Sequence, residues 1–348
     1  MNKNFKSELD CFIDKYHSEN KTSGCLRVTL KDDVIYKKFF GYADIENKVE
    51  FTDKSMFTLY SLSKPFCVLG LMKLKDKGLV DTYAHPKKYL CEAKGFDTSL
   101  TIWHLMQHIS GVPDFDQDTD FRTKYKGETS KELREQLPLL AKEGMLFSPG
   151  TKHYYTNTNF IICALIIENV SGMSYGDYMK KEIFTPLGMY DTYIDHEKLI
   201  LKDRVKGYKK DGDNIICTKR ETGWILGGAD VVSTVDDVYC LNKAIKHKML
   251  LTEESWDAIL SPHPLNSMGL GCTITNWHGR IRITHNGGWE GFRTLHIQLP
   301  EKDFDIIFLS NSAWGDARDD IANAVYNTYY GDDGSGGAVI KMDAGYIK

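Results

Sequence analysis

Apolar positions near the start of the chain change from a helical spacing to a strand-like one. Residues 6–18 form an amphipathic pattern, whereas residues 25–30 and 34–40 are rich in β-branched and aromatic side chains. Residues 31–33, Lys-Asp-Asp, lie between these two runs and favour a turn. The pattern therefore predicts a helix followed by a β-hairpin.

Helical spacing dominates from about residue 60 to residue 200. The apolar run over residues 66–72 predicts a helix that begins near Ser61, ends near Gly78 and is buried on nearly all sides. Further helices are predicted where apolar residues recur at helical spacing between turns that contain Gly and Pro, at residues 102–108, 130–142, 158–170 and 175–184.

Strand patterns return from about residue 204. Closely spaced apolar runs predict an antiparallel meander over residues 270–275, 280–285, 291–299 and 305–309. Helices are predicted at residues 230–247, before this meander, and at residues 316–329, after it.

Together these elements predict an α+β fold, in which an antiparallel sheet is flanked by helices and a helical domain is inserted in the middle. Residues 1–85 and 201–330 would form a discontinuous α/β sheet domain, and residues 86–200 an all-α domain. The glycine-rich residues 331–348 are predicted to be a flexible tail. An active site is expected at the seam of the two domains.

Composition narrows the class of protein. The 348 residues are 42% hydrophobic and 26% charged, as in ordinary globular proteins, and the formal net charge of −4 gives no basic surface for nucleic acid. No apolar stretch is long enough to predict a membrane span, and the first residues lack the apolar core of a signal peptide. The eight cysteines are scattered, with no C-x-x-C pair. They predict reduced thiols in a cytoplasmic protein rather than disulfides or a zinc site.

The most informative chemical feature is the pair Ser61 and Lys64. Residues three apart on a helix share a face, so the two side chains can meet in one pocket. A serine hydroxyl becomes a good nucleophile only when a base takes its proton, and a desolvated lysine can be that base. The alternative is a helix start with Ser61 as its N-cap and Lys64 in solvent.

Two further segments offer the groups that such a pair needs. Tyr155 and Asn157 precede an apolar helix, and they can supply a proton carrier and an amide that binds lysine and substrate. His285, Gly287 and Gly288 end a predicted strand, where glycines let the backbone approach a ligand. Taken alone, the first segment also fits a turn with a buried phenol, and the second fits a hairpin end with a surface histidine.

The motifs in this order resemble those of the serine β-lactamase and penicillin-binding protein superfamily, in its class C β-lactamase-like branch of esterases, DD-peptidases and D-aminopeptidases. That family carries S-x-x-K, then Y-x-N, then K-T-G or H-x-G, and this chain has Ser61-x-x-Lys64, Tyr155-x-Asn157 and His285-x-Gly287. Segments 100–113, 148–160 and 227–237 are also similar to the family, and the resemblance extends from about residue 8 to residue 330.

The resemblance implies a β-lactamase-like fold and a serine hydrolase. Ser61 would be the acylated nucleophile, and Lys64 and Tyr155 would share the work of general base and acid. The backbone N–H groups of Ser61 and Gly288 would form the oxyanion hole. The predicted substrate-binding and oxyanion residues are Asn157, His285, Gly287 and Gly288. No metal or organic cofactor is implied, and the expected partner is a small-molecule or short peptide substrate.

His285 is the main departure from the K-T-G members of the family. Their lysine helps to bind the carboxylate of β-lactams and of D-Ala-terminated peptides, whereas a histidine is largely neutral at pH 7. The predicted activity is therefore hydrolysis of an ester or amide, in preference to efficient hydrolysis of β-lactams. The alternatives are a penicillin-binding DD-peptidase or weak β-lactamase, and a non-catalytic scaffold of the same fold. The sequence leaves the oligomeric state open, and a homo-oligomer is one of the possibilities.

Other motifs compete with this assignment. Residues 172–176 fit the G-x-S-x-G nucleophile elbow, but that elbow must follow a strand, and Ser174 is predicted to cap a helix instead. His104 and His108 have the spacing of a metal pair, although helix packing is the favoured interpretation because no third ligand accompanies them. Trp224 and Trp289 are candidates for lining the substrate cleft, although core packing fits Trp224 equally well.

Overall fold

The computed structural model describes residues 4–20, 22–115, 129–196, 198–219, 225–314 and 317–331. Trp224 and nearly all of the predicted flexible tail lie outside the described residues. The strands are β1 (Gly24–Leu30), β2 (Asp33–Phe40), β3 (Tyr42–Asp44), β4 (Val49–Glu50), β5 (Phe57–Thr58), β6 (Tyr193–Ile194), β7 (Tyr208–Asp211), β8 (Asn214–Cys217), β9 (Val231–Ser233), β10 (Thr273–Trp277), β11 (Arg280–Trp289), β12 (Phe292–Leu299) and β13 (Phe304–Ser310).

The helices are α1 (Phe5–Asn20), α2 (Lys64–Asp76), α3 (Ile102–Met106), α5 (Ser130–Lys142), α6 (Thr158–Ser171), α7 (Tyr175–Met179), α8 (Val235–Lys246), α9 (Glu253–Ile259) and α10 (Arg318–Tyr330). Short 3-10 helices are η1 (Tyr60–Ser63), η2 (Pro86–Lys88), η3 (Cys91–Gly95) and η5 (Pro300–Lys302), and the π-helical turn η4 (Lys180–Phe184) continues α7.

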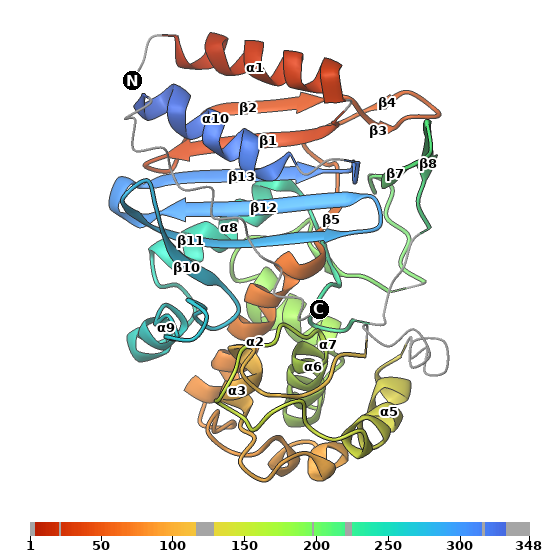
Figure 1. Ribbon diagram of the computed structural model, residues 1–348, viewed down its shortest axis with the longest axis vertical. Helices are drawn as coiled ribbons and strands as arrows, with labels where there is room; N and C mark the ends of the chain where they lie inside the picture. The colour runs from red at the N-terminus through yellow and green to blue at the C-terminus, as the bar shows by residue number, and fades with distance from the viewer. Residues whose placement is uncertain are drawn as a thin grey trace.

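The main sheet is antiparallel, with the strand order β10-β11-β12-β13-β1-β2. The N-terminal β1 pairs with the C-terminal β13, from Gly24 opposite Ser310 to Leu30 opposite Phe304. Helices α1 and α10 pack together on one face of the sheet, α8 covers the other, and the remaining helices gather below it (Figure 1). The predicted α+β fold, with a hairpin at one end of the chain and a meander at the other, is confirmed.

The predicted helix over residues 230–247 is wrong at its start. Val231–Ser233 form strand β9, which lies between β5 and β6 in a small three-stranded sheet. The β-branched Val231 and Val232 favour this pairing. Helix α8 begins only at Val235, because Thr234 is its N-cap and accepts a hydrogen bond from the N–H of Asp237 at 3.2 Å.

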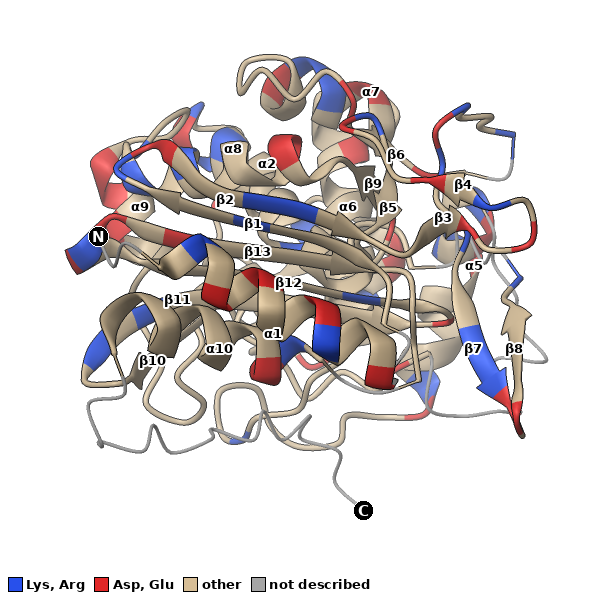
Figure 2. Cartoon of the chain, turned by 90° about the horizontal axis from the view of Figure 1, so that it is seen from above, with Lys and Arg blue, Asp and Glu red and all other residues tan. Residues whose placement is uncertain are grey.

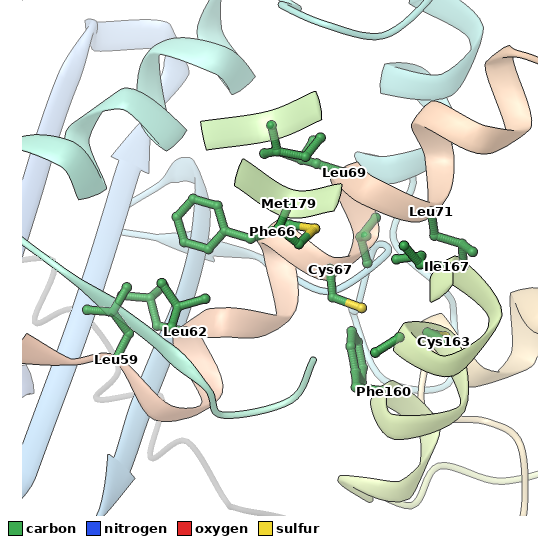
Figure 3. Packing of buried hydrophobic residues seen from close by; sticks show 14 of the residues in the cluster. Leu59, Leu62, Phe66, Cys67, Leu69, Leu71, Phe160, Cys163, Ile167 and Met179 are labelled. Atoms are coloured by element: carbon green, nitrogen blue, oxygen red, sulfur yellow. The ribbon is translucent and has the colours of Figure 1, made fainter. Parts of the chain in front are cut away.

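The apolar core runs without interruption from the inner face of the sheet into the helices. Helix α2 lies at its centre, and its side chains from Lys64 to Met72 are all buried. Figure 3 shows Phe66 and Cys67 of α2 packed near Phe160, Cys163 and Met179. This core contains residues of both the predicted sheet domain and the predicted helical domain, so it does not mark a boundary between them. The domain boundaries near residues 85 and 200 therefore stay a prediction.

Charges are mixed over the surface that the structure describes. In the view from above the sheet, Lys and Arg are interspersed with Asp and Glu on α1 and on the outer loops (Figure 2). Such a mixed surface agrees with the small net charge of the whole chain.

Candidate active site

The backbone turns sharply just before Ser61. Tyr60 has a φ of 49°, in the left-handed region that costs a non-glycine residue about 1–3 kcal/mol. The surroundings hold it there: the Tyr60 hydroxyl donates to the carbonyl of Glu290 at 3.3 Å, and its ring packs beside that of Phe292. Ser61 follows in the short helix η1, half-buried, with α2 continuing directly behind it. The turn thus presents the serine at the N-terminal end of a buried helix.

Lys64 is fully buried, which contradicts the alternative in which it lies in solvent. Its Nζ lies 3.1 Å from Ser61 Oγ, and it donates to Asn157 Oδ1 at 2.8 Å and to the Gly228 carbonyl at 2.9 Å. The same nitrogen lies 4.7 Å from the centre of the Tyr155 ring. The structure therefore brings Ser61, Lys64, Tyr155 and Asn157 together, as the motifs predict.

Asn157 is held by Asp114, which sequence reasoning missed. Asp114 Oδ1 accepts hydrogen bonds from the N–H of Asn157 at 3.1 Å and from the hydroxyl of Thr158 at 3.3 Å. These contacts fix the N-terminal end of α6, because its first N–H groups have no partner within the helix. Burial raises the pKa of Asp114, while hydrogen bonding to Asn157 and the positive charge of Lys64 act in the opposite direction. The sequence signal was an aspartate directly after Gly-Val-Pro.

Asp230 does not start a helix, in contrast to the helix predicted over residues 230–247. It precedes strand β9, and its Oδ2 accepts the N–H of Gly227 at 2.7 Å. That bond closes the turn whose next carbonyl, of Gly228, accepts from Lys64. Burial raises the pKa of Asp230 to about 7, against the opposing effects of its backbone hydrogen bonds and of Lys64. Asp230 therefore supports the turn that holds the lysine.

The glycines of the third motif lie on β11 against the segment that leads to Ser61. A Cβ atom on Gly287 would overlap the carbonyl oxygen of Leu59 and the hydroxyl of Thr294. That hydroxyl already donates to the Leu59 carbonyl at 2.8 Å. The H-x-G glycine is therefore needed so that β11 can pack directly on the backbone next to the nucleophile.

Replacing Gly287 with alanine is expected to reduce turnover at least tenfold and to lower the melting temperature, because overpacking typically costs about 1–3 kcal/mol. Activity assays and thermal unfolding of the purified variant would check this. Gly176→Ala is the matched control, since its Cβ would meet Ile194 at an ordinary 3.6 Å. A Gly287→Ala protein with native activity would contradict the close packing described above.

Gly288 lies at an open stretch of the sheet edge. Strand β10 pairs with β11 only as far as Thr284, so among the described residues no strand lies on that side of the last residues of β11. Trp289 and Phe292 flank a two-residue turn and form a hydrogen-bonded pair of the β11–β12 ladder. Hydrogen-bonded and non-hydrogen-bonded pairs alternate along an antiparallel ladder, so the N–H of Gly288, one residue earlier, points away from β12. Gly288 is also exposed. Its N–H is therefore available to a ligand at the edge, as an oxyanion donor requires.

His285 is a buried residue of β11, which contradicts the alternative of a hairpin end with a surface histidine. It lies opposite His296 in the β11–β12 pair, and its Nδ1 lies 2.6 Å from the carbonyl of Asn286. Burial, together with the positive charge of Lys64, lowers the pKa of His285 to about 3. The ring is therefore neutral at pH 7 and cannot bind a carboxylate as a cation.

The low pKa of His285 leads to a prediction about pH. A free histidine takes up a proton near pH 6.5 and the folded one only near pH 3. Neutral His285 thus contributes stability that is complete above pH 6.5 and is lost as the pH falls toward 3. In His285→Gln, we expect a lower rate of ester hydrolysis but unchanged midpoints of the rate profile between pH 5 and pH 8. A midpoint that disappears with His285 would contradict this assignment.

The competing motifs occupy structural positions. Ser174 caps α7, with its hydroxyl accepting the N–H of Asp177 at 3.1 Å, and it follows a helix instead of a strand. His104 forms a capping box with Thr101 at the start of α3. Among the described residues, no group of three or more His, Cys, Asp or Glu could hold a metal ion.

Comparison with known proteins agrees with this geometry. The Beta-lactamase family model matches residues 10–327. Penicillin-binding protein 4* of Bacillus subtilis is 29% identical over 334 residues, which cover 89% of this chain and 73% of that protein. Protein flp of Staphylococcus aureus is 22% identical over 319 residues, and the match spans 63% of its length.

Solved structures show the same fold. The octameric penicillin-binding protein homologue from Pyrococcus abyssi superposes with a TM-score of 0.84 and 26% identity, covering 93% of this chain and 77% of that one. D-amino acid amidase from Ochrobactrum anthropi SV3, complexed with D-phenylalanine, superposes with a TM-score of 0.78 and 20% identity, covering 94% and 98%. In the described parts of the chain, no helix has the length and apolar character needed to cross a membrane.

Proposed function

The chain belongs to the beta-lactamase family of serine hydrolases, and from this premise we propose that it cleaves an ester or amide bond through an acyl-enzyme on Ser61. The observation that carries the proposal is the contact of Ser61 Oγ with a fully buried Lys64 Nζ at 3.1 Å. A nucleophile within hydrogen-bond reach of a base is the arrangement that covalent catalysis requires.

The partners of Lys64 favour its action as a base toward Ser61. Asn157 Oδ1 and the Gly228 carbonyl are acceptors, so a neutral amine gives them its two hydrogens. The lone pair that is left then faces the third neighbour, Ser61 Oγ. In the proposed acylation, Ser61 attacks the substrate carbonyl while its proton passes to Lys64, and the Ser61 and Gly288 N–H groups stabilise the oxyanion.

Tyr155 is proposed to carry a proton in the second half of acylation. Its ring is half-buried beside Lys64 Nζ, which becomes an ammonium once it has taken the Ser61 proton. A phenol in such a position can protonate the leaving group and later deprotonate the water that hydrolyses the acyl-enzyme. Asn157 would orient the acyl part of the substrate. In this proposal the protein supplies every proton-transfer group itself.

The substrate class follows from the charge at the third motif. Because His285 is neutral, the site offers no cation there for a substrate carboxylate. We therefore propose neutral esters and amides as substrates, including amides of D-amino acids, since the fold is shared with a D-amino acid amidase. The resemblance to penicillin-binding protein 4* favours, as the second candidate, acylation by penicillin or by a D-Ala-terminated peptide.

A fluorophosphonate probe tests the proposal directly. We expect intact-protein mass to increase by one adduct, which peptide digestion maps to Ser61, and we expect Lys64→Ala to remain unlabelled. Preincubation with benzylpenicillin should leave this labelling intact if neutral esters and amides are the substrates, and should block it if the second candidate is right. An adduct on Ser174, or none at all, would refute the Ser61 nucleophile and favour the scaffold alternative.

The assembly state is a separate part of the proposal. The Pyrococcus abyssi homologue is described as octameric, and we propose that this chain also forms a homo-oligomer. Sedimentation velocity at several protein concentrations would test this, and a single species of about the chain mass of 39.7 kDa would refute it. A cytoplasmic location stays a prediction from the sequence.

A further inference from the structure

His108 is a fully buried residue in the loop that follows α3. It adopts a φ of 56°, in the left-handed region where histidine, asparagine and aspartate are the more tolerated side chains. Its ring lies among aromatic neighbours, with the Phe160 ring centre at 5.3 Å and the His153 ring centre at 6.4 Å. Packing alone does not require a polar ring in this position, because a phenylalanine would fill similar space.

The contacts of His108 converge on the segment that carries Tyr155. The two rings are stacked, with centres 4.2 Å apart and planes 21° apart. The N–H of Thr156 donates to His108 Nδ1 at 3.2 Å, and the N–H of Tyr154 donates to the His108 carbonyl at 2.9 Å. One residue thus contacts three consecutive residues, through its ring face, its ring nitrogen and its backbone.

We infer that His108 is a positioning residue for Tyr155, holding its phenol ring and the following backbone in register with Ser61 and Lys64. This inference rests on the proposed function, because it assigns His108 a role only if Tyr155 moves protons there. Stacking removes the freedom of the Tyr155 ring to turn away from Lys64. The bond to the Thr156 N–H keeps Asn157, the next residue, at the start of α6.

Only the neutral form of His108 can accept the Thr156 N–H and so hold Tyr155 in position. Because Nδ1 accepts the N–H of Thr156, its proton must sit on Nε2. Burial, and then the charge of Lys64, keep the pKa of His108 well below its usual range, with smaller effects of His153 and His285. A protonated ring would lose its acceptor and place a second positive charge beside the catalytic lysine. Around the ring, the side-chain amide nitrogen of Asn159 lies 3.4 Å from Nδ1, next to Tyr155 and Phe160.

Two substitutions separate the two contacts. His108→Phe keeps a ring for the stack but removes the acceptor for Thr156. His108→Asn tolerates the positive φ and offers an acceptor, but it removes the ring. For each variant we expect kcat with 4-nitrophenyl acetate to fall about 10- to 100-fold with KM changed less than about threefold, as for a displaced catalytic group. His153→Gln, on the neighbouring ring, is the matched control and should keep wild-type kinetics.

A double-mutant cycle distinguishes positioning from a general structural role. If His108 acts through Tyr155, then His108→Asn should cost little in a Tyr155→Phe background. An equal loss in both backgrounds would overturn the inference, as would a folded variant with wild-type kcat. Thermal unfolding checks that each variant is folded, and His108→Gln replaces His108→Asn if the latter shows no unfolding transition.

Failure of the proposed function looks different from failure of this inference. If wild-type protein neither turns over the ester nor takes up the fluorophosphonate at Ser61, both ideas fall. If wild-type protein is labelled at Ser61 and the His108 variants are labelled at the same rate, only the positioning role falls. Labelling that slows in parallel with kcat in both His108 variants supports the role.

Discussion

Replacing Ser61 with alanine is expected to reduce kcat/KM by about three to six orders of magnitude, because loss of a catalytic nucleophile typically has effects of this size. The substitution removes only the hydroxyl that lies 3.1 Å from Lys64 Nζ. Turnover of 4-nitrophenyl acetate, corrected for the uncatalysed rate, measures the effect. The folded state should be preserved, since Ser61 is half-buried and its methylene group remains.

Ser174→Ala is the matched control for Ser61→Ala. It removes the hydroxyl of the competing nucleophile motif and an N-cap of α7, which costs about 1 kcal/mol of stability. We expect activity to be unchanged in this variant. A protein that remains active without Ser61 and loses activity without Ser174 would reverse the assignment of the nucleophile.

Replacing Lys64 with methionine should have the next largest effect, with a loss of kcat/KM of at least about a thousandfold. Methionine fills similar space but leaves Ser61 without a base and leaves Asn157 Oδ1 and the Gly228 carbonyl without their donor. It also removes the positive charge that lowers the pKa of Asp114 and Asp230. Both carboxyl pKa values should therefore rise further.

Lys73→Met provides the control on the same helix. Lys73 Nζ also donates to a backbone carbonyl, that of Leu250 at 2.7 Å, but it lies at the opposite end of α2 from Ser61. We expect Lys73→Met to keep wild-type turnover and fluorophosphonate labelling. If Lys64→Met retained the labelling rate of the wild-type protein, Lys64 would not be the base.

Periodicity was enough to predict the elements whose sequence preference and tertiary role agree. The helix predicted over residues 130–142 coincides with α5, because Thr129 and Glu132 form a capping box and the apolar side chains share one face. The helix predicted over residues 230–247 was wrong at its start because sequence preference and tertiary role differ there. The pattern there is compatible with a helix, but pairing of Val231 and Val232 with distant strands overrides it. The β-branched side chains favour a strand, but the local sequence does not show that partner strands lie beside them.

The residues of the candidate site also fall into a group that the sequence predicted and a group that it did not. Ser61, Lys64, Tyr155 and Asn157 lie in short motifs that are weak when taken singly. The resemblance of these motifs, in this order, to those of a known family brought the four residues together in one hypothesis. The groups that hold them were not predictable, because their contacts join segments far apart in the chain. The Gly228 carbonyl on Lys64 and the stack of His108 on Tyr155 are of this kind. Such contacts depend on the folded backbone, which a sequence pattern does not encode locally.

The pairing of β1 with β13 has a consequence for how the chain is made. The central part of the main sheet needs Gly24–Leu30 beside Phe304–Ser310, so its closure waits for nearly the whole polypeptide to leave the ribosome. Until then β1 and β2 form a lone hairpin, which is at best marginally stable in water. The N-terminal strands therefore depend on the last strand for their burial, and a chain interrupted before residue 304 leaves β1 as an open sheet edge that is prone to aggregation.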